Sequence, residues 1–165
     1  MAVPILVTFI GTGCGVPSKK RGPASLLINV GNTLLWFDTG SGSLRRLIEA
    51  GGSYQDIDYI VYTHFHLDHT GDLASFLFAS KYPLAPRQKD LNIIGPYGIL
   101  ELYNNLLELY GEQISELPYN VNIVEVGVQK FEPLHDKWSL KVIKTLHTPE
   151  SQGYKLTDKI GRAHV

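Results

Sequence analysis

The segment that most constrains this chain is a cluster of metal-ligand residue types that directly follows a short apolar run. Within six positions the cluster contains three histidines and one aspartate, namely His64, His66, Asp68 and His69. Neutral imidazole is a common ligand of zinc and related ions, and carboxylate is a second ligand type. After a strand, His64 and His66 can point the same way, while Asp68 and His69 turn toward a second ion. The spacing therefore predicts a loop that supplies ligands to two metal ions.

A solvated polar loop is the alternative interpretation of the same segment. A lone histidine in a protein is more often structural than a ligand. Here three histidines stand beside an aspartate, between an apolar strand and the start of an amphipathic helix. That combination favours the metal site.

Charge and composition exclude several other classes of protein. The chain has 165 residues, 44% of them hydrophobic, and 15 Lys+Arg against 16 Asp+Glu give a net charge of −1. A globular fold is therefore expected, without the basic field that is typical of nucleic-acid binding. No apolar run reaches the length of about 20 residues that a membrane span needs, and the N-terminus does not start a signal peptide. The single cysteine, Cys14, excludes an intramolecular disulfide framework and favours a reducing, cytoplasmic compartment.

Apolar runs and turn residues predict strands that alternate with helices. Strands are expected at residues 5–10, 26–30, 33–37, 58–62, 91–94, 121–126, 140–146 and 153–157. Helices are expected at residues 43–50, from residue 73 to before Pro83, and after Pro96, the first two with Ser43 and Asp72 as N-caps. The pattern indicates a layered α/β architecture and one domain over residues 1–165.

Several residues are expected to be structural. The apolar face of the third helix is expected to pack in the core, and it consists of Leu100, Tyr103, Leu106, Leu107 and Tyr110. Cys14 is expected to be a buried, inert thiol and His135 a surface residue. The glycine-rich loop 11–15 is not a dinucleotide fingerprint, because Val16 stands where the third glycine is needed. No nucleotide cofactor is therefore expected.

The histidine cluster also resembles a known signature. The pattern His64-x-His66-x-Asp68-His69 is similar to the motif of the metallo-β-lactamase fold, a superfamily of mostly zinc-dependent hydrolases. Other motifs, spread over nearly the whole chain, resemble the ribonuclease Z branch: Phe9 to Pro17, Arg21, Ser25, Asp38-Thr39-Gly40, Ile94 to Gly98 and His147 to Tyr154. The resemblance implies an αββα sandwich, of which this chain supplies the N-terminal half to two-thirds, mainly the first sheet.

The resemblance also implies the site. His64, His66 and His147 would bind the first metal ion, and Asp68 and His69 the second. Asp68 would in addition handle the proton of the attacking water or hydroxide. Asp38 would be a structural acid at the floor of the site. The implied cofactors are two divalent ions, which are expected to be zinc, with manganese or iron as alternatives. Two such cations lower the pKa of a bound water and neutralise charge on the attacked group.

Two parts of the family pattern are expected to be absent. The family supplies a bridging Asp from a later strand and a last His ligand, whereas after His147 the chain offers only Asp158 and His164. Asp158 is interpreted as a loop carboxylate, and His164 as part of the strand that leads to the bridging Asp. The domain is therefore expected to be incomplete at its C-terminus. The segment from Lys155 to Arg162 also leaves no room for a tRNA-gripping arm, so tRNA is possible but not favoured.

The leading hypothesis for function is a metal-dependent phosphodiesterase, acting on a small phosphodiester or a cyclic nucleotide. An arylsulfatase or ester hydrolase of the same fold is the first alternative. A metal-binding but non-catalytic family member, incomplete in its ligand set, is the second. Because an incomplete sandwich leaves apolar sheet surface uncovered, a homo-oligomer is expected.

Overall fold

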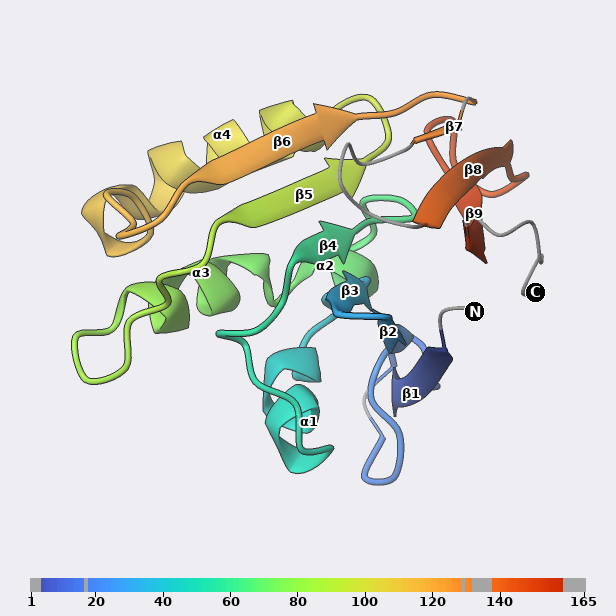
Figure 1. Cartoon of the computed structure of the whole chain (residues 1–165). Coiled ribbons are helices and arrows are strands. Elements are labelled where there is room, and N and C mark those ends of the chain that lie inside the picture. The colour runs from blue at the N-terminus through green and yellow to red at the C-terminus, as the bar shows by residue number, and fades with distance from the viewer. Residues whose placement is uncertain (1–3, 17, 129, 132–137, 159–165) are drawn as a thin grey trace.

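Two sheets of unequal size organise the chain (Figure 1), and the computed structural model describes residues 4–16, 18–128, 130–131 and 138–158. The larger sheet has the order β1-β2-β3-β4-β5-β6 and the smaller the order β7-β8-β9. The strands are β1 (Ile5–Gly11), β2 (Ser25–Val30), β3 (Thr33–Phe37), β4 (Tyr59–Val61), β5 (Leu91–Gly95), β6 (Val121–Glu125), β7 (Lys130–Phe131), β8 (Trp138–Lys144) and β9 (Gln152–Asp158). The helices are α1 (Ser43–Glu49), α2 (Leu67–Thr70), α3 (Leu73–Lys81), α4 (Ile99–Tyr110) and the short 3-10 helix η1 (Gly111–Gln113).

The larger sheet changes direction of pairing in the middle. Strands β1, β2 and β3 are antiparallel neighbours, whereas β3, β4, β5 and β6 pair in parallel. Parallel strands need crossover connections, and α1, α2 with α3, and α4 lie in those three connections. The carboxyl ends of β3 to β6 therefore meet at one edge of the sheet, where α/β proteins place their ligands.

Side chains that alternate along the central strands point to opposite faces of the larger sheet and form two separate hydrophobic cores. Trp36, Ile60 and Ile93 face the helices, and the Trp36 ring lies 5.8 Å from that of Phe76 in α3. Their strand neighbours, among them Val61, face the smaller sheet. The molecule is thus layered as helices, sheet and sheet, which confirms the predicted α/β architecture. The larger sheet has six strands and the smaller three, so the chain supplies mainly the first sheet, as the resemblance implies.

Of the two predicted helix caps, Ser43 is wrong, whereas Asp72 is the N-cap residue of α3 but does not cap that helix with its side chain. Helix α1 begins at Ser43 with Gly42 as its N-cap, and neither α1 nor α3 has a side-chain hydrogen bond from its own N-cap. Instead the Asp72 carboxylate, just before α3, accepts hydrogen bonds from the backbone N–H groups of Gly42 and Leu44. Asp72 therefore serves the start of α1, about 30 residues earlier in the chain, because the two segments are neighbours in space.

Three other expectations need correction or lie outside the described residues. On α4, Tyr103, Leu106 and Leu107 pack on the core as predicted, but Leu100 and Tyr110 at the ends of the face are exposed. Cys14 is exposed, not buried, because the glycine-rich loop that carries it leaves the sheet. The side chains of His135, Asp158 and His164 lie outside the described part of the structure. Within that part, no helix has both the length and the apolar character needed to cross a bilayer.

A fully buried arginine joins the segments on either side of β4. The Arg87 guanidinium donates hydrogen bonds to four main-chain carbonyls, those of Tyr54, Gln55, Ile57 and Asp90. It also stands 5.2 Å from the centre of the Tyr119 ring. The charge is therefore solvated by main-chain carbonyls from two separate stretches of backbone packed around it.

We expect Arg87→Met to lower the free energy of unfolding by at least about 3 kcal/mol, because it leaves buried carbonyls without a donor. Urea unfolding followed by circular dichroism measures the change. Lys89→Met is the control, since Lys89 is partly exposed and pairs with Asp58, and such pairs contribute less than about 1 kcal/mol. Equal losses in the two variants would show that the buried hydrogen bonds of Arg87 are not needed.

Candidate metal centre

The candidate metal ligands gather at the carboxyl edge of the parallel strands. Asp38 directly follows β3, the segment from Thr63 to His66 follows β4, and His147 lies in the connection between β8 and β9. The N–H of Gln152, the first residue of β9, donates to the carbonyl of Thr63 at 3.0 Å. This contact brings a segment more than 80 residues away against the histidine loop.

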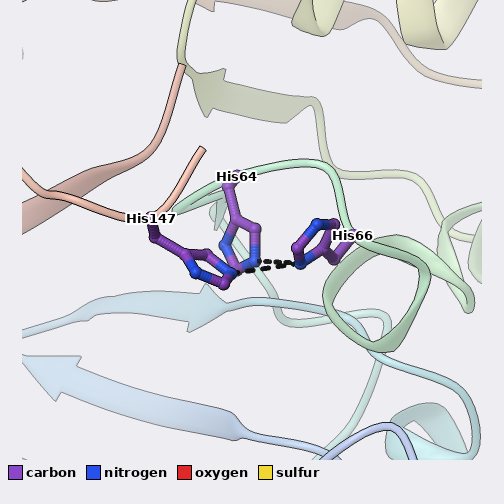
Figure 2. Close-up of side chains that lie close together, drawn as sticks. All are labelled: His64, His66 and His147. Carbon is purple, nitrogen blue, oxygen red and sulfur yellow. Dashed lines mark hydrogen bonds between the residues drawn. The ribbon is translucent and has the colours of Figure 1, made fainter. Parts of the chain in front are cut away.

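Three imidazole rings converge on one point, as Figure 2 shows for His64, His66 and His147. Nδ1 of His66 lies 3.2 Å from Nε2 of His64 and 3.1 Å from Nε2 of His147. A tetrahedral zinc ion with bonds of about 2.0–2.1 Å requires ligand nitrogens about 3.3–3.4 Å apart. Two of the three nitrogen pairs therefore have about the spacing of zinc ligands, and all three nitrogens lie within 4.8 Å of one another, so the donor set fits the implied metal.

Asp68 and His69 lie beside this group of three histidines. The sequence predicts a loop at this position, but both residues belong to the single turn of α2. Nε2 of His69 is 3.8 Å from Oδ2 of Asp68, and the His69 ring centre is 4.1 Å from that of His64. One nitrogen and one carboxylate oxygen thus lie next to the first group.

The Asp38 carboxylate orients both groups. Oδ2 of Asp38 accepts hydrogen bonds from Nδ1 of His69 at 2.8 Å and from the hydroxyl of Thr63 at 2.9 Å. The Thr63 hydroxyl oxygen in turn lies 2.9 Å from Nδ1 of His64. A hydroxyl that donates to Asp38 can only accept from His64, so His64 and His69 both carry their proton on Nδ1. Their Nε2 lone pairs are left free, as metal ligands require.

The environment also sets the charge of these two histidines. Burial lowers the pKa of His64, which favours the neutral ring that binds a metal. The hydrogen bond to Asp38 raises the pKa of His69. At a given pH, a larger fraction of His69 rings than of His64 rings is therefore protonated, and a metal ion that binds His69 must displace that proton.

The backbone around Asp38 is shaped to make this network possible. Asp38 adopts a left-handed conformation with φ of 53°, which Asp tolerates better than most residues. Gly40 lies against the main chain of Asp68, and a Cβ at this position would stand 1.9 Å from the Asp68 carbonyl oxygen. The glycine after Asp38-Thr39 is therefore required so that the loop can contact α2.

Two functional side chains were missed from the sequence. Thr63, which links Asp38 to His64, could have been noticed as a hydroxyl directly before the first histidine. Asp72 gives no local signal of its contact with α1, because that contact is tertiary.

We expect Asp38→Asn to weaken metal binding about 10- to 100-fold, the range typical for loss of such an orienting carboxylate. The NH₂ group of the new amide must face a hydrogen-bond donor. It faces either the backbone N–H of Thr63, or the Thr63 hydroxyl together with Nδ1–H of His69. Competition with a chromophoric chelator measures zinc affinity in the variant.

Thr63→Ser is the matched control, because it keeps the hydroxyl between Asp38 and His64. We expect its zinc affinity to match that of the unchanged chain. Zinc binding by Asp38→Asn that is as tight as in the Thr63→Ser control would contradict the orienting role.

A family model described as "Anti-Pycsar protein Apyc1" matches residues 5–161. Among individual proteins, the chain is 33% identical over 159 residues to a ribonuclease Z of Picrophilus torridus, covering 96% of this chain and 50% of that protein. It is 32% identical over 156 residues to a ribonuclease Z of Streptococcus uberis, covering 92% of this chain and 50% of the relative. The chain thus spans half the length of these relatives.

Solved structures give the same fold. The chain superposes on the short form of human tRNase Z with a TM-score of 0.78 at 23% identity, covering 95% of this chain and 66% of that one. It superposes on the metallo-β-lactamase fold protein YhfI of Bacillus subtilis with a TM-score of 0.76 at 22% identity, covering 94% and 60% of the two chains. These likenesses confirm the metallo-β-lactamase fold, and the identity to the ribonucleases Z agrees with the resemblance inferred from the motifs.

Proposed function

Because this chain belongs to the family of the anti-Pycsar protein Apyc1, we propose that it acts as a metal-dependent phosphodiesterase with two divalent ions, zinc first. The observation that carries the proposal is the convergence of three imidazole nitrogens within 4.8 Å of one another, two pairs of them at 3.1 and 3.2 Å. Its neighbours Asp68 and His69 would hold the second ion. The likeness to ribonucleases Z supports a phosphodiester as the attacked bond.

Each residue of the site has a separate task in this proposal. His64, His66 and His147 hold the first ion, and His69 with Asp68 the second. Bound divalent ions would activate water and neutralise charge on the phosphoryl oxygens. Asp68 accepts the proton of the attacking water at a carboxylate oxygen, for which its partly exposed position next to His69 is suited. Asp38 stays out of the reaction and holds the rings.

A small phosphodiester, such as a cyclic nucleotide, is favoured over tRNA as substrate. Residues 152–158 form the continuous strand β9, which pairs along its length with β8, so this stretch does not form a tRNA-gripping arm. The net charge of −1 also supplies no basic field for a large polyanion. We further infer a reducing, cytoplasmic setting from the single exposed cysteine.

We expect the purified chain, supplied with zinc or manganese, to hydrolyse bis-p-nitrophenyl phosphate and to lose this turnover in Asp68→Ala. The reason is that Asp68 serves both as ligand and as proton acceptor. An aryl sulfate measured in parallel separates the alternative, since an arylsulfatase would hydrolyse it faster. A cyclic nucleotide and a tRNA precursor then test the substrate class.

Metal content is the control for these rates. Zinc, manganese and iron are quantified in the freshly purified chain and in His64→Ala, which should retain less metal. Finding none of the three metals in either protein would contradict the proposal. Bound metal without turnover on any ester would instead favour a metal-binding, non-catalytic family member.

An uncovered apolar surface supports self-association. Strand β1 is at the edge of the larger sheet, and its Leu6 and Phe9 side chains are about two-thirds exposed, at 65% and 68%. Residues of β1, β2 and β9 also line a mainly apolar cavity of about 430 Å³. Exposed apolar edge strands tend to pair with other chains.

We therefore expect a dimer or larger assembly at micromolar concentration, measured by light scattering. Replacing Phe9 with serine should shift the mass toward the monomer, since it removes apolar surface from the edge strand. Leu84→Ser is the control, because Leu84 is exposed but lies on the loop after α3. A monomeric unchanged chain would contradict the expectation.

A further inference from the structure

We propose that Asp72 is a positioning residue for the second metal ion, acting through the loop between β3 and α1. The proposal rests on the proposed function, because it concerns the same site, but it assigns a task to a residue outside the ligand set. Asp72 is nearly buried, at 9% exposure, and follows α2 directly. Its carboxylate has three partners at the start of α1: Oδ1 is 3.0 Å from the Gly42 nitrogen, and Oδ2 is 2.8 Å from the Leu44 nitrogen and 3.5 Å from the Ser43 hydroxyl oxygen.

The backbone of Asp72 is attached to the same loop. Its N–H donates to the carbonyl of Thr39 at 2.7 Å, and the N–H of Thr39 donates to the carbonyl of His69 at 2.6 Å. Residues 39–44 are therefore bound to residues 69–72 at two places. The main-chain bonds act near Thr39, and the Asp72 side chain acts near Gly42.

The two segments are also in close contact between these attachments. Gly40 lies against the Asp68 carbonyl, and a Cβ at Gly71 would stand 2.4 Å from the hydroxyl oxygen of Ser41. Asp38 directly precedes the first segment, Asp68 directly precedes the second, and His69 is the first residue of the second. A shift of one segment against the other would therefore move the Asp38 carboxylate relative to the His69 ring that it orients.

The effect of losing the carboxylate should fall unequally on the two ions. The backbone N–H groups of Gly42 and Leu44 would lose their carboxylate acceptor. Because the N-cap residue Gly42 has no side chain, it cannot supply another acceptor for the start of α1. The loop would then be held near Thr39 alone. Of the ligands of the first ion, His64 follows β4 and His147 comes from the other sheet, and only His66 belongs to α2, as its N-cap. Both proposed ligands of the second ion, Asp68 and His69, lie within α2.

Zinc titration of the metal-free chain by calorimetry tests this. We expect Asp72→Ala to weaken the second binding step about 10- to 100-fold and to weaken the first step by a smaller factor. Asp72→Asn should have a smaller effect, because its amide oxygen can still accept one hydrogen bond. If Asp72→Ala does not fold, Asp72→Asn takes its place in the comparison.

Asp90→Ala is the matched control. The Asp90 carboxylate likewise accepts a backbone hydrogen bond from a distant segment, at 2.9 Å from the Asn120 nitrogen, but it lies in the loop before β5. We expect both zinc steps to be unchanged in this variant. Equal weakening of the two steps in folded Asp72→Ala would mean a general structural role and would overturn the proposal, as would two unchanged steps.

Amide hydrogen exchange of the metal-free chain separates this inference from the proposed function. In Asp72→Ala, we expect faster exchange at Leu44 and also at Thr39, whose N–H donates to the His69 carbonyl. Faster exchange at both sites supports the positioning of α2 by Asp72, even if no variant hydrolyses a phosphodiester. Faster exchange at Leu44 with unchanged exchange at Thr39 would restrict Asp72 to capping α1 and would overturn the proposal.

Discussion

The Asp38 carboxylate is the interaction on which the rest of the site depends. It accepts hydrogen bonds from the backbone and hydroxyl of Thr63 and from the ring of His69. Through these bonds one buried anion selects the tautomer of a histidine in each ligand group. A ligand histidine whose second nitrogen is bound in this way is held in orientation and made more basic. The network therefore prepares the lone pairs of both groups before any ion arrives.

The fold explains why such a network can form at this place. Parallel pairing of β3 with β4 brings the residues that follow each strand to the same edge, so Asp38 and Thr63 become neighbours although 25 positions separate them. The Asp38 N–H continues the pairing by donating to the Val61 carbonyl. Glycine at position 40 then lets the loop contact α2. The sheet thus positions the acid, and the small residues next to it allow the close approach.

Sequence patterns predicted the ligand residues better than the contacts that support them. The histidine cluster, the strand before it and the glycine-rich loop are local signals, and the structure brings His64, His66 and His147 together as the resemblance implied. Local patterns failed where the partner of a polar group was distant. Ser43 and Asp72 were assigned as caps of the helices that follow them, whereas Asp72 binds the start of α1. Cys14 was expected in the core because free cysteine is usually buried, but its loop faces solvent.

By itself, the sequence determined the α/β class, the order of the elements and the residue types offered to a metal, because strand and helix periodicity and ligand spacing are properties of short segments. Only the folded molecule shows which nitrogen of His64 and of His69 is free, that Asp38 links these two rings, and that Asp72 binds the start of α1. These features depend on pairing between strands and loops far apart in the chain. Hydrogen bonds across such distances leave no periodic trace in the sequence, so they could be read only from the folded molecule.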